Sequence, residues 1–464
     1  MSVPIFDSFL TAPEIIEVFD DQAVIQAMLQ FERALAQAQA QEGVIPHAAA
    51  EAIAACCDVG LYDVPAIVAA SRRAGSLAIP LVKELTKAVA ARDAEAATHV
   101  HWGSTSQDVI DTGAVLVTRE ALKRLDLELE ALCVRLVSLA EQHLSTPVLA
   151  RTLMQPAQVT SLGFKFSNWA APLLRAREQL RHVAGSALQL QLGGAVGTLA
   201  VMGEKGPAVA RRVADALGLS LPVAAWHTQR DEWVRLGLEV AILTGSLGKI
   251  AKDLSLMAQG EIAELAEPSG QGRGGSSAMP HKRNPVSSMI ALAASSRVPH
   301  HAAALLANMP QEHERGLGNW QAELAEWPGI FLSAFGAARA LREAMDGLQV
   351  DTDRMRRNID ALQGLVFAEA VSIYLASAIG RPSAHHLMET LTRDAVSRGE
   401  PLGAVVGAAV QADAALREKI DLLTLNTLFD PVAATRSGQA QASAQLAVLR
   451  AAIADISSSC IGKQ

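Results

Sequence analysis

Two runs of apolar residues with helical spacing constrain the fold of this chain more than any other feature. Between Leu122 and Leu139, and again between Leu243 and Met257, apolar residues recur at alternating steps of three and four, the spacing of one buried helix face. The runs consist of Leu122, Leu125, Leu129, Leu132, Leu136 and Leu139, and of Leu243, Leu247, Ile250, Leu254 and Met257. Two such segments, well separated in sequence, predict long helices that pack as a bundle in the middle of the chain.

The composition favours an all-α fold in three domains. Aromatic residues make up 4% of the chain and alternating β-branched runs are rare, whereas Ala and Leu are abundant. At 464 residues the chain is too long for one core. Breaks in the pattern predict an N-terminal helical domain (1–111), a central long-helix bundle (112–352) and a small C-terminal helical domain (353–464). In the last domain we expect two helices around a turn at Gly380–Pro382.

Charge and cysteine usage exclude several classes of protein. The net charge is −8 and no dense basic run exists, which disfavours a nucleic-acid partner. No apolar stretch approaches the roughly 18 residues of a membrane span, and the first residues do not resemble an export signal, so we expect a cytoplasmic protein. The four cysteines show neither a disulfide framework nor the spacing of a metal site.

The segment Gly270–Pro285 is the strongest candidate for a functional loop. It has the sequence GQGRGGSSAMPHKRNP, in which glycines free the backbone and Ser276, Ser277, Lys282 and Asn284 follow closely. The plain alternative is a glycine-rich surface linker, but such dense polar functionality is typical of a site.

The local context predicts how this loop is held. We expect it to follow a long helix that ends near Glu267–Pro268. Asn284 should then cap the next helix, with Pro285 as its first residue, so that free N–H groups there attract a carboxylate. Gly270, Gly272 and Gly275 match the GxGxxG letters of a dinucleotide site. We reject that interpretation because the loop follows a helix and no acidic residue lies between Asn284 and Gln311.

The segment His99–Thr112 predicts a second anion-binding helix start. Ser104 and Gln107 have the spacing of a capping box, with Thr105 and Ser106 between them. Ordinary capping is the alternative explanation for these hydroxyls. His99 and His101 lack the partner ligands of a metal site, so hydrogen bonding is the better interpretation and no metal is expected.

Three further segments carry less specific signals. RTLMQPA from Arg151 and QLGGAVGTLA from Gln191 are each expected to begin or end a bundle helix. EHERGLGNWQ from Glu312 places Arg315 on a glycine-broken turn, where a solvated charge cluster is the default interpretation.

Taken in order, these segments resemble the fumarase/aspartase superfamily. Its GSSxMPxKxNP signature is matched by Gly275–Pro285, the other segments lie between His99 and Arg315, and the C-terminal sequence from Leu365 is also similar. The resemblance implies a homotetramer with a central 20-helix bundle, in which each active site is built from three subunits.

The resemblance also implies roles for individual residues. Ser276 would transfer the proton, and serine needs N–H donors and a cation such as Lys282 to act as a base. His101 matches a substrate-contacting histidine. The other positions expected to hold substrate are Thr105, Ser106, Gln107, Gln155, Ser277, Asn284 and Arg315.

One departure from the family pattern indicates the substrate class. Leu153 stands where fumarases and adenylosuccinate lyases have a histidine in an RTHxQ segment. A carboxylate, with a parent pKa of roughly 4, leaves or attacks without an acid, whereas an amine or hydroxide does not. The sequence therefore predicts a cofactor-free, lactonising enzyme that acts on a small-molecule tricarboxylate.

Two alternatives stay open at this point. An adenylosuccinate lyase-type C–N lyase would share the loop but would need another acid, His143 or His281. A catalytically silent scaffold on the same fold would be contradicted by intact Ser276, Lys282 and Asn284.

Overall fold

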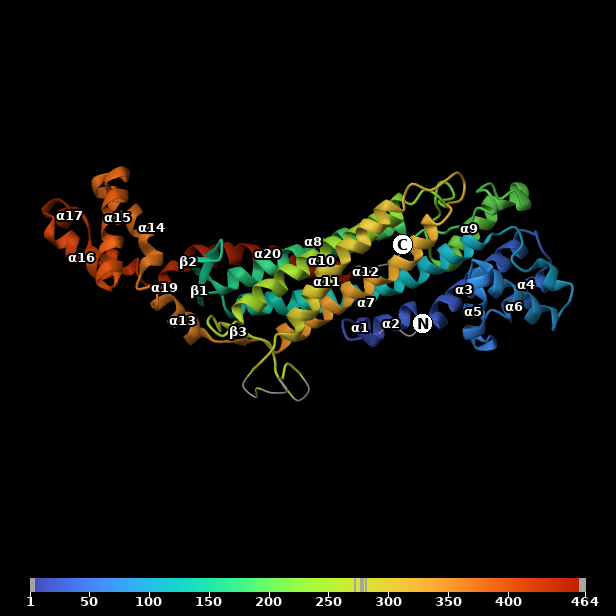
Figure 1. Cartoon of the computed structure of the whole chain (residues 1–464). Coiled ribbons are helices and arrows are strands. Elements are labelled where there is room, and N and C mark those ends of the chain that lie inside the picture. Colours follow the sequence, from blue (N-terminus) through green and yellow to red (C-terminus); the bar gives the residue numbers. More distant parts are fainter. Residues whose placement is uncertain (1–4, 271–272, 276–278, 280–281, 459–464) are drawn as a thin grey trace.

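The long helices of the expected bundle lie side by side in the middle of the molecule (Figure 1). The computed structural model describes residues 5–270, 273–275, 279 and 282–458. The bundle consists of α7 (Ser106–Gln142), α8 (Leu162–Ala187), α10 (Asp231–Met257), α11 (Val286–Ala307) and α12 (Asn319–Asp346). Each helix packs on the next in this order, and α12 packs back on α7, so the helices enclose a common core. The all-α fold class is confirmed.

The two apolar seams are buried in this core, as the sequence predicts. Within α7 and α10 every seam residue is buried. Around them pack aromatic side chains, among which Trp233 of α10 stacks on Trp327 of α12 with ring centroids 3.9 Å apart. Stacked aromatic pairs contribute to packing beyond their buried area, so the seams and aromatic side chains together hold the bundle.

A helical N-terminal part lies at one end of the bundle, around the start of α7 (Figure 1). From Ile25 onward its helices pack their own apolar cluster with residues of the segment 190–214, whereas Ile15 and Val18 are buried in the core of the bundle. The elements are α1 (Ile5–Ser8), α2 (Pro13–Ile16), η1 (Glu17–Phe19), α3 (Asp21–Gln41), α4 (His47–Ala54), η2 (Val59–Leu61), α5 (Val64–Ala74), α6 (Ala78–Ala90) and η3 (Ala96–His99), with η4 (Ala200–Lys205) and α9 (Gly206–Leu217) beside them.

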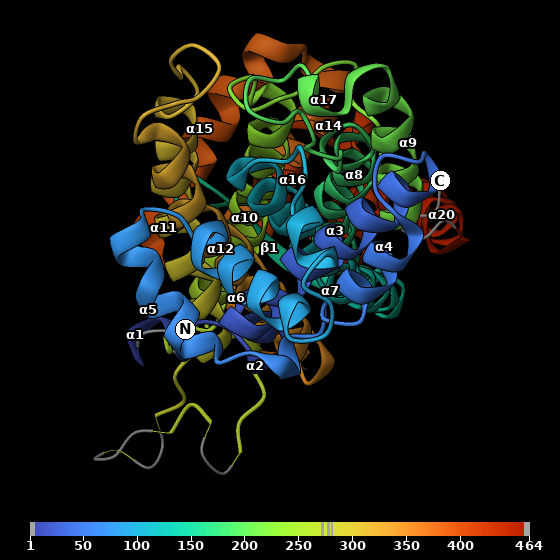
Figure 2. The same cartoon turned by 90° about the vertical axis from the view of Figure 1, so that its right-hand side faces the viewer.

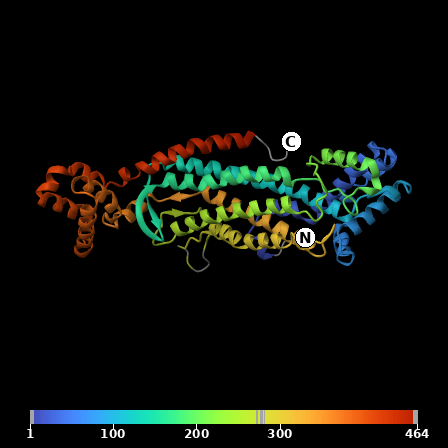
Figure 3. The ribbon, with the colours of Figure 1, turned by 90° about the horizontal axis from the view of Figure 1, so that it is seen from above.

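A second helical part lies at the other end of the bundle (Figures 1 and 3). Its elements are α13 (Thr352–Asp360), η5 (Leu365–Phe367), α14 (Ala368–Ile379), α15 (Arg381–Arg398), α16 (Leu402–Ala412), α17 (Ala414–Lys419), α18 (Leu422–Thr427) and α19 (Pro431–Ala434). The predicted turn is confirmed, because Gly380 ends α14 with a φ of 79° that favours glycine. The last helix, α20 (Arg436–Ser458), returns along α8 and α7.

Short strands replace two features that the sequence analysis assigned to helices. Arg151 lies in a hairpin of β1 (Pro147–Thr152) and β2 (Gln155–Ser161). The strands pair because Leu149 and Val159, which lie opposite each other, both pack into a small apolar cluster. The helix expected to end near Glu267 ends instead at Met257. After Gly260 the chain turns, and β3 (Leu265–Ala266) pairs antiparallel with β4 (Gln349–Val350).

The division into three domains stays a proposal. Of the four apolar clusters in the described residues, the one in residues 371–425 lies within a single predicted part, whereas the others combine residues of two or three parts, and α7 runs unbroken across position 111. In the described chain no single helix is long and apolar enough to cross a membrane. Only the bent pair Thr352–Asp360 and Leu365–Ile379, at 82°, meets the length and composition requirement together.

Candidate active site

Asp108 is the centre of a buried polar cluster at the start of α7. Its carboxylate accepts hydrogen bonds from the backbone N–H of Gly193 and Gly194 at 3.0 and 2.9 Å, and from the N–H of Thr105 at 3.1 Å. His227 Nε2 lies 2.7 Å from the same carboxylate. The Asp108 side chain thus joins Thr105 at the helix start, the pair Gly193 and Gly194, and His227, which lies shortly before α10. We call these residues, together with Asp108, the Asp108 cluster.

The helix start is displaced by one residue from the predicted capping box. Thr105, not Ser104, is the N-cap of α7, and Asp108 occupies the third helical position that was assigned to Gln107. The Gln107 side chain is buried, and its amide donates to Asp111 at 3.1 Å and to the His227 carbonyl at 2.8 Å. The capping prediction was wrong because a carboxylate pairs with the helix N-terminus better than an amide does.

A second buried network, centred on Arg230, lies next to the Asp108 cluster. Arg230 is fully buried and its guanidinium bonds Asp111 at 2.8 Å and Glu323 at 2.5 Å. Burial alone would lower the pKa of Arg230, but these two carboxylates raise it, so it stays a cation. Trp320 Nε1 also donates to Asp111 at 2.9 Å. The network fixes α7, α10 and α12 relative to one another beneath the cluster.

His101 and Arg315 lie against the Asp108 cluster. Arg315 donates to the carbonyl oxygens of Gly194 at 3.1 Å and Ala195 at 3.3 Å. His101 Nδ1 lies 2.5 Å from a carboxylate oxygen of Glu32 in α3. The structure therefore brings together His101, Thr105, Ser106, Gln107 and Arg315, although these residues come from segments more than 200 positions apart.

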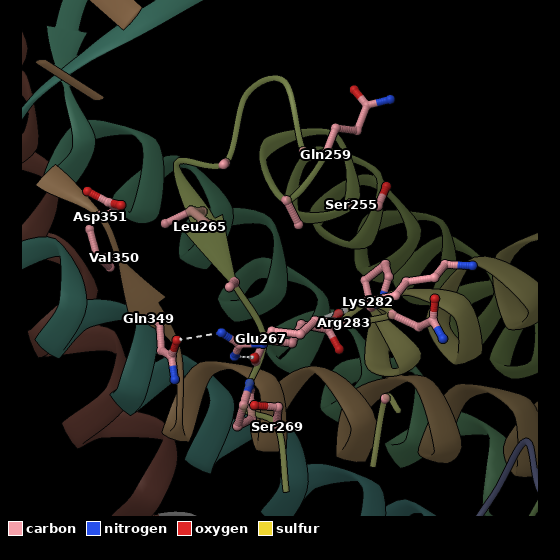
Figure 4. Close-up of a pocket in the computed structure, with 18 of the residues that line it drawn as sticks. Ser255, Gln259, Leu265, Glu267, Ser269, Lys282, Arg283, Gln349, Val350 and Asp351 are labelled. Carbon is pink, nitrogen blue, oxygen red and sulfur yellow. Dashed lines mark hydrogen bonds between the residues drawn. The ribbon is translucent and has the colours of Figure 1, made fainter. Parts of the chain in front are cut away.

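The signature loop borders a separate cavity of about 960 Å³. Lys282, Arg283 and Asn284 line it together with Glu267 and Gln349 (Figure 4). Lys282 and Arg283 are both exposed, and the Arg283 guanidinium donates to the Gln349 side chain at 3.0 Å and to the Glu267 carbonyl at 2.9 Å. Ser276 and Ser277 lie outside the described residues. The described residues beside them project from the bundle in the end-on view of Figure 2.

The start of α11 differs from its prediction. Pro285 is the N-cap and the helix begins at Val286, so Asn284 is not the cap. The Glu267 carboxylate accepts the N–H groups of Ser287 and Ser288, both at 2.8 Å. A protein carboxylate already occupies this helix N-terminus, so the expected free N–H groups for a substrate carboxylate are taken.

Gln155 and Leu153 lie on the hairpin between α7 and α8. Leu153 and Met154 form its tip, with left-handed φ angles of 49° and 68° and with 97% and 68% of their surfaces exposed. Gln155 is the exposed first residue of β2. Arg151 of this hairpin pairs with Glu264, which precedes β3, at 2.7 Å. The hairpin is thus attached near the loop cavity, not near the Asp108 cluster.

The candidate residues therefore form two groups at opposite ends of the bundle. Arg230 anchors the start of α10 beside the Asp108 cluster, and α10 then runs for 27 residues, roughly 40 Å, before the chain reaches the loop. None of the residues that line the loop cavity belongs to the Asp108 cluster. Within the described residues, one copy of the chain does not assemble the expected site.

Comparison with known proteins identifies the family. The sequence profile of a lyase family matches residues 9–299. This chain belongs to the fumarase/aspartase superfamily of lyases. Enzymes of this superfamily act on small molecules and generally form oligomers.

Relatives that are named as 3-carboxy-cis,cis-muconate cycloisomerases match this chain over nearly its whole length. The 3-carboxy-cis,cis-muconate cycloisomerases of Bradyrhizobium diazoefficiens and Pseudomonas aeruginosa are each 46% identical over 438 residues. The alignments cover 94% of this chain and 96% and 94% of the relatives. The crystal structure of 3-carboxy-cis,cis-muconate lactonizing enzyme from Pseudomonas putida has a TM-score of 0.91 at 41% identity, over 97% of this chain and 100% of that chain.

The described residues around Gly270 do not form the strand-loop-helix unit of a nucleotide-binding site. One reason for rejecting the GxGxxG match was wrong, since the loop follows a strand. That strand has two residues and pairs antiparallel with β4, so it is not part of a βαβ unit. In the described part of the lyase, no three His, Cys, Asp or Glu side chains form a group that could hold a metal ion.

Sequence reasoning missed Asp108, Glu32 and Glu267. A signal for Asp108 was present, because Thr105 and Asp108 have the same capping-box spacing as Ser104 and Gln107. Glu32 lies in an ordinary helical run and Glu267 precedes a proline, and neither position carries a local pattern that predicts its partner.

Proposed function

We propose that this chain converts 3-carboxy-cis,cis-muconate to 4-carboxymuconolactone, a step of protocatechuate degradation. The observation that carries the proposal is the 46% identity, over nearly the whole chain, to relatives that bear this activity. The reaction is an isomerisation in which a carboxylate oxygen bonds to a carbon of the substrate's own double bond. The π electrons move toward a second carboxylate, and one proton is added at the adjacent α-carbon.

The residues divide these tasks in a way that fits a tricarboxylate. We infer that Ser276, with Lys282 nearby, delivers the proton, and that His101, Thr105, Ser106 and Arg315 hold carboxylate groups. Gln107, Gln155, Ser277 and Asn284 complete the expected contacts. The attacking carboxylate needs no protein acid, which agrees with Leu153 in the family's histidine position. No cofactor enters these steps.

The separation of the two groups supports a site shared between copies. Because α10 keeps them roughly 40 Å apart in one chain, a second copy must supply the loop that faces the Asp108 cluster. Exposed apolar side chains are in accord with this: Val196, Val223 and Leu317 lie on the segments that flank the cluster. We propose a homotetramer whose active sites combine three subunits.

The test is a spectroscopic assay with 3-carboxy-cis,cis-muconate that follows loss of the conjugated diene. We expect turnover, and in heavy water one deuterium at the α-carbon of the product. cis,cis-Muconate, which lacks the third carboxylate, should react poorly.

Adenylosuccinate tests the C–N lyase alternative. Cleavage of adenylosuccinate without reaction of 3-carboxymuconate would contradict the proposal. The alternative would need His143 as an acid. Burial and then Arg135 lower the pKa of His143, so the protonated imidazole that would donate the proton is less populated than in an ordinary histidine. The other candidate acid, His281, lies outside the described residues.

A further inference from the structure

Glu32 is a carboxylate that the fold buries directly behind His101. It lies on α3 with 1% of its surface exposed, and its Oε1 atom is 2.5 Å from His101 Nδ1. The His101 side chain is 17% exposed. Burying an ionised carboxylate this deeply costs free energy unless the carboxylate is paired, so Glu32 depends on its contact with His101.

The backbone around His101 is fixed in an unfavourable conformation. His101 has a left-handed φ of 57°, which is uncommon for a residue other than glycine. The buried Gln39 side chain, also on α3, donates to the Trp102 carbonyl at 2.6 Å. Gly194 packs so closely on Gly103 that a Cβ at Gly194 would lie 2.9 Å from the Gly103 carbonyl. Such strain persists where the surroundings determine it, and it is concentrated at functional sites.

The pairing assigns different tasks to the two ring nitrogens. Because Nδ1 is bonded to Glu32, only Nε2 remains to bind a ligand. Burial would lower the pKa of His101, but Glu32, with a smaller contribution from Asp108 of α7, raises it. Arg315, from the segment between α11 and α12, is bound to the nearby Gly194 carbonyl. A raised pKa means that His101 keeps its positive charge to a higher pH than an ordinary histidine does and loses it as the pH rises through the raised pKa.

Other buried polar atoms around His101 lack partners among the described residues. They are Glu32 Oε2, Gln39 Oε1, His99 Nδ1 and Arg315 Nε. Buried polar groups are normally satisfied, so a group of unsatisfied atoms beside a partly exposed imidazole indicates a place where a polar ligand binds.

We propose that Glu32 is a positioning residue that holds His101 as an imidazolium, so that its Nε2–H binds a carboxylate of the substrate. The identity of that substrate rests on the proposed function, but the ionisation of His101 does not. The two can therefore be tested separately.

The ionisation is tested by deuterium exchange at the Cε1 carbon of histidine, measured by mass spectrometry as a function of pH. The full-length protein is compared with Glu32→Gln and with Glu326→Gln. Glu326 is a matched control because it contacts His301 Nδ1 at the same 2.5 Å, in a pair that includes no residue of the Asp108 cluster. We expect the His101 midpoint to lie above that of an ordinary histidine, to fall in Glu32→Gln and to stay unchanged in Glu326→Gln.

Turnover of 3-carboxymuconate provides the second measurement. A hydrogen bond that involves a charged group is worth about 10- to 100-fold in binding, so KM in Glu32→Gln should rise by that factor at a pH just below the measured wild-type midpoint of His101. The increase should shrink only as the pH falls below the ordinary histidine value of about 6.5, because burial lowers the pKa of His101 once Glu32 is removed, and kcat should change less than KM. A purely structural defect would not follow this pH profile.

Several results would overturn the inference. A wild-type His101 midpoint at or below that of an ordinary histidine would do so even if Glu32→Gln failed to fold. An unchanged midpoint in a folded Glu32→Gln protein would do so as well. A protein that is inactive on 3-carboxymuconate but shows the expected titration would contradict the proposed function and leave the role of Glu32 supported.

Discussion

Asp108 shows how one buried carboxylate can order a site. Its two oxygens accept hydrogen bonds from the backbone N–H groups of Gly193, Gly194 and Thr105, and His227 Nε2 is within hydrogen-bond distance of the same carboxylate. The donors come from three segments, which Gln107 and Gln191 join as well through hydrogen bonds to the His227 carbonyl and to Asp111. Since Arg315 in turn binds the Gly194 carbonyl, the position of that cation also depends on Asp108.

Asp108→Asn should destabilise the protein and reduce its activity. The amide nitrogen of Asn would face N–H donors, so we expect a loss of about 1–3 kcal/mol in unfolding free energy and at least about a tenfold loss of kcat/KM. Denaturant unfolding and steady-state kinetics measure both. Asp63→Asn is the control, because Asp63 accepts only the Ala66 N–H at the exposed start of α5. Equal effects of the two substitutions would contradict the role given to Asp108.

Ser276→Ala should abolish most of the chemistry without preventing binding. General acid–base groups contribute about 10²–10⁴-fold, and kcat should fall by that factor while KM changes little. Ser397→Ala, at an exposed position of α15, is the control for loss of a hydroxyl. A Ser276→Ala enzyme with near-normal kcat would refute the assignment of the proton carrier.

At the scale of elements, the helix starts and the hairpin tip determine which backbone N–H groups and side chains are free to contact a ligand. Both α7 and α11 begin with a protein carboxylate on their first N–H groups, from Asp108 and Glu267. The hairpin tip instead presents Leu153 to its surroundings in a left-handed conformation. An exposed side chain in that conformation can be exchanged without disturbing a core.

Leu153→His tests the argument that selected the substrate. The exposed position should tolerate the change, and histidine adopts left-handed φ more readily than leucine does, so stability should be preserved. A carboxylate nucleophile needs no acid, so kcat with 3-carboxymuconate should not increase. Steady-state kinetics and thermal unfolding check both points. A gain of about tenfold or more would show that the reaction does use a protein acid there.

At the scale of the whole molecule, the length of the bundle separates the two groups of candidate residues. The helices that carry them are continuous, so no local loop movement can close a distance of roughly 40 Å. Assembly of copies brings distant ends together without bending any helix.

Mixed oligomers test whether the site is shared. Thr105→Ala and Ser276→Ala should each be nearly inactive alone, whereas a reassembled equal mixture should regain activity. If the two residues come from different chains, about a quarter of the sites in random tetramers contain both native residues. Activity of mixed tetramers, verified by native mass spectrometry, is the measurement. No recovery at all would show that each site lies within one chain.

The sequence by itself determined the helical class, the buried seams of α7 and α10 and the turn at Gly380. These depend on periodic burial and on the freedom of glycine at positive φ, which are properties of neighbouring residues. The signature loop likewise identified the family, because its chemistry is concentrated within sixteen consecutive positions. The starts of α7 and α11 were each predicted to within one residue; at α7 the error arose because Ser104 and Thr105 have equivalent spacing to the residues that follow them.

Only the tertiary structure decided which polar residues meet. Glu32 pairs with His101 across 69 positions, and Asp108 meets His227 across 119, because packing of α3, α7 and α10 buries these groups where each needs a partner. The hairpin around Leu153 also escaped prediction although its two strands are neighbours in sequence, and the strand before Gly270 escaped because it has two residues and a remote partner. Satisfaction of a buried charge is a property of the packed molecule, and no local window of sequence contains it.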